Sequence, residues 1–205
     1  MRILAIETAS EACSIALFEG GRLLASDHRV LGRGHAEALV PMIAALPDKG
    51  RAKSIRVSLG PGSFTGVRIG IATARALGVA WGAEVLGYPT LALVAASAPS
   101  SFRAVTVCMN GGHGEWFVQN FCDGEAQDKA QSLTPQYAAK ACLHDQIIGN
   151  RAEELAALFN CEKQAQDALP DARETARLST AFFTGDLAPH YGRAPDAQPM
   201  KAGIL

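Results

Sequence analysis

Residues 60–70 constrain the fold of this chain more than any other segment. They follow a short apolar run, residues 55–59, which is typical of a strand. The sequence Gly-Pro-Gly then predicts a tight turn, because glycine adopts unusual backbone angles and proline fixes one of them. Ser63 is a favourable N-cap, and the residues after it predict one long helix that ends near Trp81. The chain is therefore expected to contain a strand, a glycine turn and a helix in direct succession.

A glycine turn that leads into a helix also resembles a phosphate-binding loop, because the N–H groups at a helix N-terminus attract anions. This segment has no Gly-Lys-Ser/Thr ending and no lysine that could pair with a phosphate, so it is not a P-loop. The sequence leaves two interpretations open here: a weak anion site, or a purely structural joint between the strand and the helix.

Small residues recur at every fourth position along the expected helix, namely Gly62, Gly66, Gly70, Ala74, Gly78 and Gly82. Because glycine inside a helix costs about 0.5–1 kcal/mol relative to alanine, such a row indicates close approach of another backbone. The only charged residues of the helix are Arg68 and Arg75, which predicts that it is buried nearly all round. Its neighbour is either a segment of this chain or another protein. For the second case the candidate interface residues are Leu39, Met42 and Ile43 of an expected helix over 35–46, together with Gly66, Gly70, Ala74 and Gly78.

Length and composition are those of an ordinary soluble globular protein. The chain has 205 residues, 48% of them hydrophobic and 19% charged, which suits one large domain or two small ones. Its net charge of −1 is not the basic excess of a protein that binds nucleic acid directly, so contact with tRNA is expected only indirectly. No signal peptide is recognised, and no apolar run approaches the ~20 residues that span a membrane.

The cysteines and histidines show no metal-binding pattern. The five cysteines are widely spaced and include no Cys-x-x-Cys pair, which indicates reduced thiols and a cytoplasmic protein. Cys13 and Cys108 fall in expected strands, where we expect them to be buried. No two of the five histidines are four residues apart, so no helical metal pair is predicted.

The expected elements divide into two units. The first has strands at 2–7, 13–19 and 22–30, a helix at 35–46 that Pro41 distorts or shortens, a strand at 55–59, the long helix, a strand at 84–87 and a helix at 89–98. The sequence Ala-Pro-Ser-Ser at 98–101 indicates a boundary, which gives a domain at 1–98 and a smaller one at 99–205. The second unit is expected to have strands at 103–109, 115–121 and 146–148, helices at 135–143, 151–159 and 172–184, a loop at 123–132 and an irregular tail from Pro189.

Both units open with an apolar strand, a turn of small and polar residues, and an antiparallel return strand. This layout resembles the two ribonuclease-H-like halves of the actin/sugar-kinase/Hsp70 superfamily, an α/β fold with mixed sheets flanked by helices. In that superfamily the turns resemble Asp-x-Gly-Thr and Asp-x-Gly-Gly, their amides hold phosphates, and their aspartates serve the metal. Here Glu7 and Asn110 stand at the aspartate positions. The resemblance therefore implies a vestigial phosphate turn, with Glu7, Thr8 and Ser10 as candidate cofactor-binding residues.

Three segments are similar to the bacterial TsaB (YeaZ) family. They are residues 1–16, residues 60–70, and Pro189-His190-Tyr191-Gly192-Arg193, which resembles the Pro-x-Tyr-x-Arg of that family. The resemblance is strong over residues 1–95 and patchy afterwards. It implies a noncatalytic partner of TsaD that, with TsaE and TsaC, supports formation of threonylcarbamoyladenosine at position 37 of tRNAs reading codons that begin with A. It also implies that the chain pairs with a TsaD-like protein through helices of its first domain.

The chain departs from the family in its second hairpin. The family usually shows Asp-Ala-Arg-x-Gly-Glu-Val-Tyr there, whereas residues 110–117 read Asn-Gly-Gly-His-Gly-Glu-Trp-Phe. No role of the missing aspartate and arginine is therefore carried over to this chain. By the same resemblance, no cofactor is expected for the isolated chain. ATP or ADP is expected only in the complex with the TsaD-like protein and a TsaE-like ATPase. Whether the chain also forms a homodimer is left open.

Two enzymatic functions are the alternatives. A glycoprotease-like metallopeptidase needs two or three metal ligands and an open coordination position, and the chain lacks the metal-binding His-x-x-x-His of TsaD. A small ATPase of the sugar-kinase superfamily needs a metal-holding acid and a base. Glu7 is either that acid or a polar residue that ends a buried strand, and nothing supplies the base. Hydrogen bonds within the turn explain Thr8 and Ser10 equally well.

Overall fold

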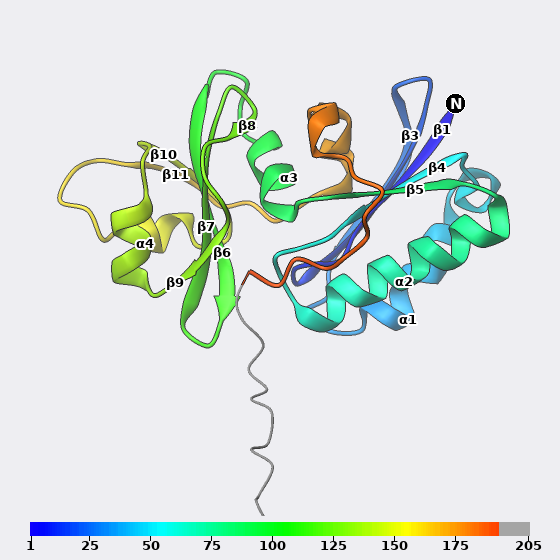
Figure 1. The fold of residues 1–205 in the computed structure, drawn as a ribbon, viewed down its shortest axis with the longest axis horizontal. Coiled ribbons are helices and arrows are strands. Elements are labelled where there is room, and N and C mark those ends of the chain that lie inside the picture. Colours follow the sequence, from blue (N-terminus) through cyan, green and yellow to red (C-terminus); the bar gives the residue numbers. More distant parts are fainter. Residues whose placement is uncertain (193–205) are drawn as a thin grey trace, which may run out of the picture.

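The structure of the protein, a computed structural model, describes residues 1–192 and contains two sheets flanked by helices (Figure 1). The first sheet consists of β1 (Arg2–Glu7), β2 (Ala12–Glu19), β3 (Arg22–Val30), β4 (Ser54–Ser58) and β5 (Glu84–Tyr88), in the order β3-β2-β1-β4-β5. The central strand β1 pairs antiparallel with β2 and parallel with β4. Its last four residues are buried, as its continuous apolar sequence predicts.

The second sheet repeats this beginning. It consists of β6 (Ala104–Gly112), β7 (Glu115–Cys122), β8 (Glu125–Ala126), β9 (Gln131–Leu133), β10 (Gln146–Ile148) and β11 (Gln164–Gln166). β6 pairs antiparallel with β7 and parallel with β10, so the hairpin and its parallel neighbour match β2, β1 and β4 of the first sheet. The predicted α/β fold with two similar halves and mixed sheets is confirmed.

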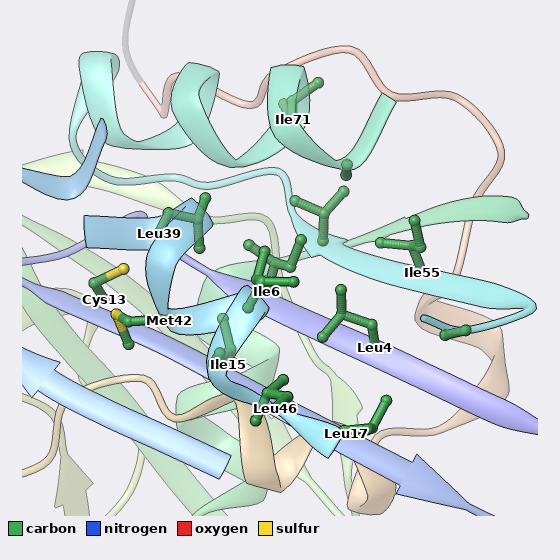
Figure 2. Close-up of a cluster of buried hydrophobic side chains, with 14 of the residues drawn as sticks. Leu4, Ile6, Cys13, Ile15, Leu17, Leu39, Met42, Leu46, Ile55 and Ile71 are labelled. Carbon is green, nitrogen blue, oxygen red and sulfur yellow. The ribbon is translucent and has the colours of Figure 1, made fainter. Parts of the chain in front are cut away.

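Two helices cover one face of the first sheet, α1 (His35–Ala45) and α2 (Phe64–Trp81) (Figure 1). The α2 boundaries match the prediction, because Oγ of Ser63 accepts a hydrogen bond from the N–H of Gly66 and the helix ends at Gly82 in the left-handed conformation. α1 continues through Pro41, which lies on the exposed side of the helix. Proline has no N–H to donate, so water can hydrogen-bond to the backbone carbonyl that is left without its helical partner. Figure 2 shows the core between sheet and helices, with Leu4, Ile6, Ile15 and Leu17 facing Leu39, Met42 and Ile71.

The second sheet carries the other helices. α3 (Thr90–Ala96) packs on β6 and β7 and forms a second core with Phe121, Val107 and Ile148. α4 (Pro135–Ala141) and α5 (Ala152–Ala156) lie on the opposite side, where Val118, Ile147 and Leu155 are buried. Within residues 1–192, no helix has the length and apolar character needed to cross a membrane.

Two segments cross the predicted boundary between the halves. α3 precedes residue 98 but packs on the second sheet. Residues 171–192 belong to the second half but return to the first sheet, where the N–H of Ala172 donates to Ser14 at 3.0 Å and the N–H of His190 donates to the carbonyl of Leu59 at 2.7 Å. The division into 1–98 and 99–205 stays a prediction, and these two segments pack across its limit.

Several short elements differ from the prediction. Residues 172–184 do not form the predicted α-helix. They form two 3-10 turns, Ala172–Arg177 and Thr180–Phe182, because Leu178 is extended and Ser179 caps a new turn. The predicted loop at 123–132 contains β8 and the start of β9, which pair with β7. The predicted helix at 151–159 is only Ala152–Ala156, and β11 was not predicted. Arg193 and the remainder of the predicted irregular tail lie outside the described residues.

Candidate functional site

A cleft of about 780 Å³ lies where the two hairpin turns approach each other. Ala9, Ser10 and Glu11 of the first turn contribute one wall, and residues 110–113 of the second turn contribute another. The start of α2 and the returning C-terminal segment complete the cleft with Phe64, Arg68 and Tyr191. The two turns that the sequence relates to each other thus meet at one site.

Glu7 is fully buried at the end of β1 and does not line this cleft. Its Oε1 accepts hydrogen bonds from the N–H of Ala9 at 2.6 Å and from the hydroxyl of Ser58 at 2.9 Å. Its Oε2 has no partner among the described residues. Burial raises the pKa of the Glu7 carboxyl from 4.5 to about 7, although hydrogen bonds from Ala9, Ser58 and Thr8 oppose this rise.

The other two predicted turn residues have different positions. Thr8 is buried and donates its hydroxyl hydrogen to the carbonyl of Gly66 at 2.7 Å, so it joins the turn to α2. Ser10 lines the cleft, and its hydroxyl oxygen accepts a hydrogen bond from the N–H of Ala12 at 3.1 Å. Of the three candidates Glu7, Thr8 and Ser10, only Ser10 therefore reaches the cleft.

The glycines before and within α2 face other parts of this chain. A Cβ atom added to Gly62 would lie 2.1 Å from the carbonyl oxygen of Ala9, and one added to Gly66 would lie 2.1 Å from that of Thr8. A Cβ at Gly70 would lie 2.4 Å from Oγ1 of Thr8. The row of glycines therefore lets the first hairpin turn rest directly on the helix.

All seven candidate interface residues are buried within the chain itself, namely Leu39, Met42, Ile43, Gly66, Gly70, Ala74 and Gly78. Periodicity alone does not distinguish a close approach to the chain's own sheet from an approach to a partner. In the chain alone, these seven residues are therefore covered by other residues of the chain. An interface on α1 and α2 stays a prediction that concerns the exposed positions of these helices.

Three side chains at the cleft rim form a cluster that sequence reasoning did not assign. The guanidinium carbon of Arg68 lies 3.6 Å from the centre of the Phe64 ring, and the ring centres of Phe64 and Tyr191 are 5.2 Å apart. Nε of Arg68 also donates to the hydroxyl of Tyr191 at 3.0 Å. The sequence did contain a signal for this cluster, because its three residues lie in two of the segments that resemble a known family, 60–70 and 189–193.

A chain of hydrogen bonds connects the two halves across the cleft. Nδ2 of Asn150 donates to Oε1 of Glu11 at 2.8 Å, and Oδ1 of Asn150 accepts from the N–H of Asn110 at 2.8 Å. Oδ1 of Asn110 in turn accepts from the N–H of Gly112 at 3.1 Å. Asn150 thus couples the first turn to the second. No sequence pattern singled it out, because its partners are distant in the chain.

Several N–H groups of the two turns are bonded within the chain. Those of Ala9, Ala12, Gly112 and Asn110 donate to the side chains of Glu7, Ser10, Asn110 and Asn150, respectively. At the start of α2, the N–H of Ser63 donates to the carbonyl of Ala9 and the N–H of Gly66 to Oγ of Ser63. Of the two interpretations of residues 60–70, these contacts favour the structural joint.

Within residues 1–192, no three His, Cys, Asp or Glu side chains gather in a way that could hold a metal ion. Cys13 and Cys108 are buried, as predicted, and burial raises the pKa of the Cys13 thiol to about 11.

Comparison with known proteins gives consistent matches. The family model described as "TsaD: tRNA N6-adenosine threonylcarbamoyltransferase" matches residues 29–186. The chain is 32% identical over 187 residues to the tRNA threonylcarbamoyladenosine biosynthesis protein TsaB of Escherichia coli (strain K12), which covers 87% of this chain and 78% of that protein. Among solved structures, YeaZ from Pseudomonas aeruginosa superposes with a TM-score of 0.75 at 28% identity, covering 86% of this chain and 89% of the other. The ethanolamine utilization protein EutJ from Carboxydothermus hydrogenoformans, with a TM-score of 0.51 at 10% identity and coverage of 92% and 89%, shares the fold alone.

Proposed function

The chain belongs to the TsaB (YeaZ) family of tRNA threonylcarbamoyladenosine biosynthesis, and from this membership we propose that it is a noncatalytic partner subunit of a TsaD-like enzyme. The complex forms threonylcarbamoyladenosine at position 37 of tRNAs that read codons beginning with A, with a TsaE-like ATPase as a further component. The observation that carries the proposal is the exposed apolar surface of α1 and α2.

The outward side of α2 is exposed, and apart from Arg68 and Arg75 it carries mostly apolar side chains. Ala72, Ala76, Val79 and Ala80 are exposed there, and 87% of Val79 is open to solvent. The prediction that α2 is buried nearly all round is therefore wrong for the chain alone. Its inner side packs on the sheet, whereas its outer side has no cover among the described residues.

α1 continues this surface beside α2. Val40, Pro41, Ala44 and Ala45 are exposed on it, and the two helices contact each other. We call the exposed residues of α1 and α2 named here the outer helical surface. Exposed apolar side chains that gather on neighbouring helices are typical of a protein–protein contact. The small side chains would allow the backbone of a partner helix to come close.

The chemistry of the chain agrees with a binding role. The sequence has no His-x-x-x-His. Glu7, which stands at the aspartate position of the first turn, is buried away from the cleft. Acyl transfer to tRNA would therefore depend on groups of the TsaD-like partner.

The experiment that tests this proposal is an association measurement between the purified chain and the TsaD-like protein of the same organism. Val79→Asp places a charge on the outer helical surface, where burial of an unpaired charge costs several kcal/mol. Each 1.4 kcal/mol is a tenfold change in affinity, so we expect the affinity to fall at least about a hundredfold.

Val30→Asp is the matched control, because Val30 is 65% exposed on β3, far from α2 in the sheet order. It should bind the TsaD-like protein as the wild type does. Both variants should melt at the wild-type temperature, since both side chains are exposed. Equal affinity of Val79→Asp and wild type would refute this surface as the interface.

A further inference from the structure

Exposed positive charges gather at one end of the first sheet, where β1, β4 and β5 begin. The N–H of Lys53 donates to the carbonyl of Arg2 at 3.1 Å, and the N–H of Glu84 donates to the carbonyl of Lys53 at 3.1 Å. The residues before β4 therefore lie between the starts of the other two strands. We call the exposed cations of these segments and of the neighbouring β2–β3 turn the basic end. They are Arg22, Lys49, Arg51 and Lys53.

The acids at this end do not neutralise the basic end. Glu19 lies between Arg2 and Arg22 in the sheet register, and its Oε1 is 3.0 Å from Nε of Arg2. Oδ2 of Asp48 is 3.0 Å from Nη1 of the same arginine. Arg2 thus pairs with two of the three acids, and Glu84 is the third. The basic end itself forms no ion pair with any residue in the described part of the chain.

The basic end lies away from the cleft. Figure 1 shows that β1, β4 and β5 begin on the side of the molecule that faces away from the second sheet, and that α2 ends on the same side. None of its four residues lines the cleft between the hairpin turns. The net charge of the whole chain, −1, hides this local excess, because it also counts the acids of the second half.

Separate cations of this kind suit a chain of phosphates. Each is an exposed, long side chain with its charge at the tip, and long-range attraction to a polyanion needs no shaped pocket. In nucleic-acid complexes such lysines and arginines contact successive phosphates and release the counterions held there. They position the nucleic acid without reading its bases.

We propose that the basic end contacts the phosphate backbone of the tRNA, so that this subunit helps to hold the substrate of the complex. The identity of the nucleic acid rests on the proposed function, whereas the contact itself concerns the chain alone. The inference departs from the expectation that the chain meets tRNA only indirectly, which used the charge of the whole chain and not its distribution.

The test is titration of a fluorescently labelled, unmodified tRNA with the full chain, followed by anisotropy between about 50 and 200 mM KCl. We expect binding at the lower salt concentration and a steep loss as the salt concentration rises. The double variant Lys49→Gln/Lys53→Gln removes two phosphate contacts. It should bind tRNA at least about tenfold more weakly at 50 mM KCl, and its plot of log affinity against log salt should be shallower by about 1.4–1.8.

Lys129→Gln/Lys140→Gln is the matched control, because it removes the same charge from two exposed lysines of the second half. It should bind tRNA nearly as the wild type does, and thermal melting should show both double variants folded. Equal affinity and equal salt dependence of the two double variants would overturn the proposal. Binding to vesicles that contain phosphatidylserine, with no binding to tRNA, would also overturn it.

Association with the TsaD-like protein is measured separately. Neither Lys49 nor Lys53 belongs to the outer helical surface, so Lys49→Gln/Lys53→Gln should associate with that protein as the wild type does. A wild-type chain that binds the TsaD-like protein but not tRNA would overturn this inference and leave the proposed function standing. A wild-type chain that binds tRNA but not the TsaD-like protein would contradict the proposed function and support the basic end.

Discussion

Nε of Arg68 donates a hydrogen bond to the hydroxyl oxygen of Tyr191 at 3.0 Å, although the two residues are 123 positions apart in the chain. Phe64 adds an aromatic contact to Tyr191 and a cation–π contact to Arg68. The first turn of α2 is thereby tied to the C-terminal segment that crosses over the glycine turn. The same segment is also paired to Leu59 and Gly87 by backbone hydrogen bonds.

We expect Tyr191→Phe to separate the hydrogen bond from the ring contacts. Loss of the hydroxyl should lower the free energy of unfolding by about 0.5–1.5 kcal/mol, because a typical hydrogen bond contributes that much. Tyr191→Ala also removes the contact with Phe64 and should cost about 0.5–1.5 kcal/mol more. Urea unfolding measures both values, and equal destabilisation by the two variants would contradict a contribution from the ring.

Gly66→Ala should destabilise the protein, although alanine is the better helix former. In an unconstrained helix this change stabilises by about 0.5–1 kcal/mol. Here the added Cβ would lie 2.1 Å from the carbonyl oxygen of Thr8, so the first hairpin turn must move. We expect a net loss of about 1–3 kcal/mol, the usual cost of overpacking, in urea unfolding.

Gly185→Ala is the control for this change, because a Cβ at Gly185 meets no atom within 4 Å. It should leave the free energy of unfolding nearly unchanged. Gly70→Arg, which would probe Gly70 as a partner contact, is expected to unfold the chain, since even a Cβ there would lie 2.4 Å from Oγ1 of Thr8. A folded Gly66→Ala variant as stable as wild type would show that the turn does not rest on α2 in solution.

Glu7 should make stability depend on pH near neutrality. Burial raises the pKa of its carboxyl to about 7 in the folded chain, against an ordinary value of 4.5. Between these values the unfolded chain has released the proton while the folded chain still holds it, so the free energy of unfolding falls as the pH rises. Each pKa unit corresponds to about 1.4 kcal/mol, and the wild type should therefore lose roughly 3 kcal/mol between pH 4.5 and 7 through this group.

Glu7→Gln removes this titration. Urea unfolding at a series of pH values should show that the difference in stability between wild type and Glu7→Gln shifts in favour of the variant as the pH rises from 5 to 8. Comparing the slopes avoids any constant effect of the new amide on the absolute stability. Parallel profiles of the two proteins would contradict a raised pKa of Glu7.

Local signals explain which parts of this fold could be predicted. The bounds of α2 were predicted closely because Ser63 is an N-cap signal within the helix's own sequence and the apolar run ends near Trp81. The strands of the first sheet could be predicted because apolar runs mark them in the sequence. β8 and β11 were missed because they have only two and three residues and are mostly exposed, so no periodicity reveals them. The predicted helix over 172–184 failed because Leu178 is extended and Ser179 caps a new turn, while the Leu178 side chain is buried in the core beside α3.

The site was less predictable because it depends on contacts between distant residues. Thr8 and Glu7 belong to the turn that the sequence singled out, but their side chains point into the chain and support α2 and β4. Asn150 and Tyr191 reach the cleft from the second half, and no local pattern shows this. The small residues of α2 were correctly expected to permit close approach, yet the periodicity could not show that Thr8 and Ala9 are the neighbours.

The most direct test of the proposed function is the amount of threonylcarbamoyladenosine in tRNA, measured by mass spectrometry of digested tRNA from cells depleted of this protein. We expect depletion to lower the modified nucleoside strongly, the wild-type chain to restore it, and the Val30→Asp chain to restore it equally. Val79→Asp, expressed at the same level, should fail to restore it, because its outer helical surface no longer binds the TsaD-like enzyme. An unchanged amount of threonylcarbamoyladenosine after full depletion would contradict the proposed function.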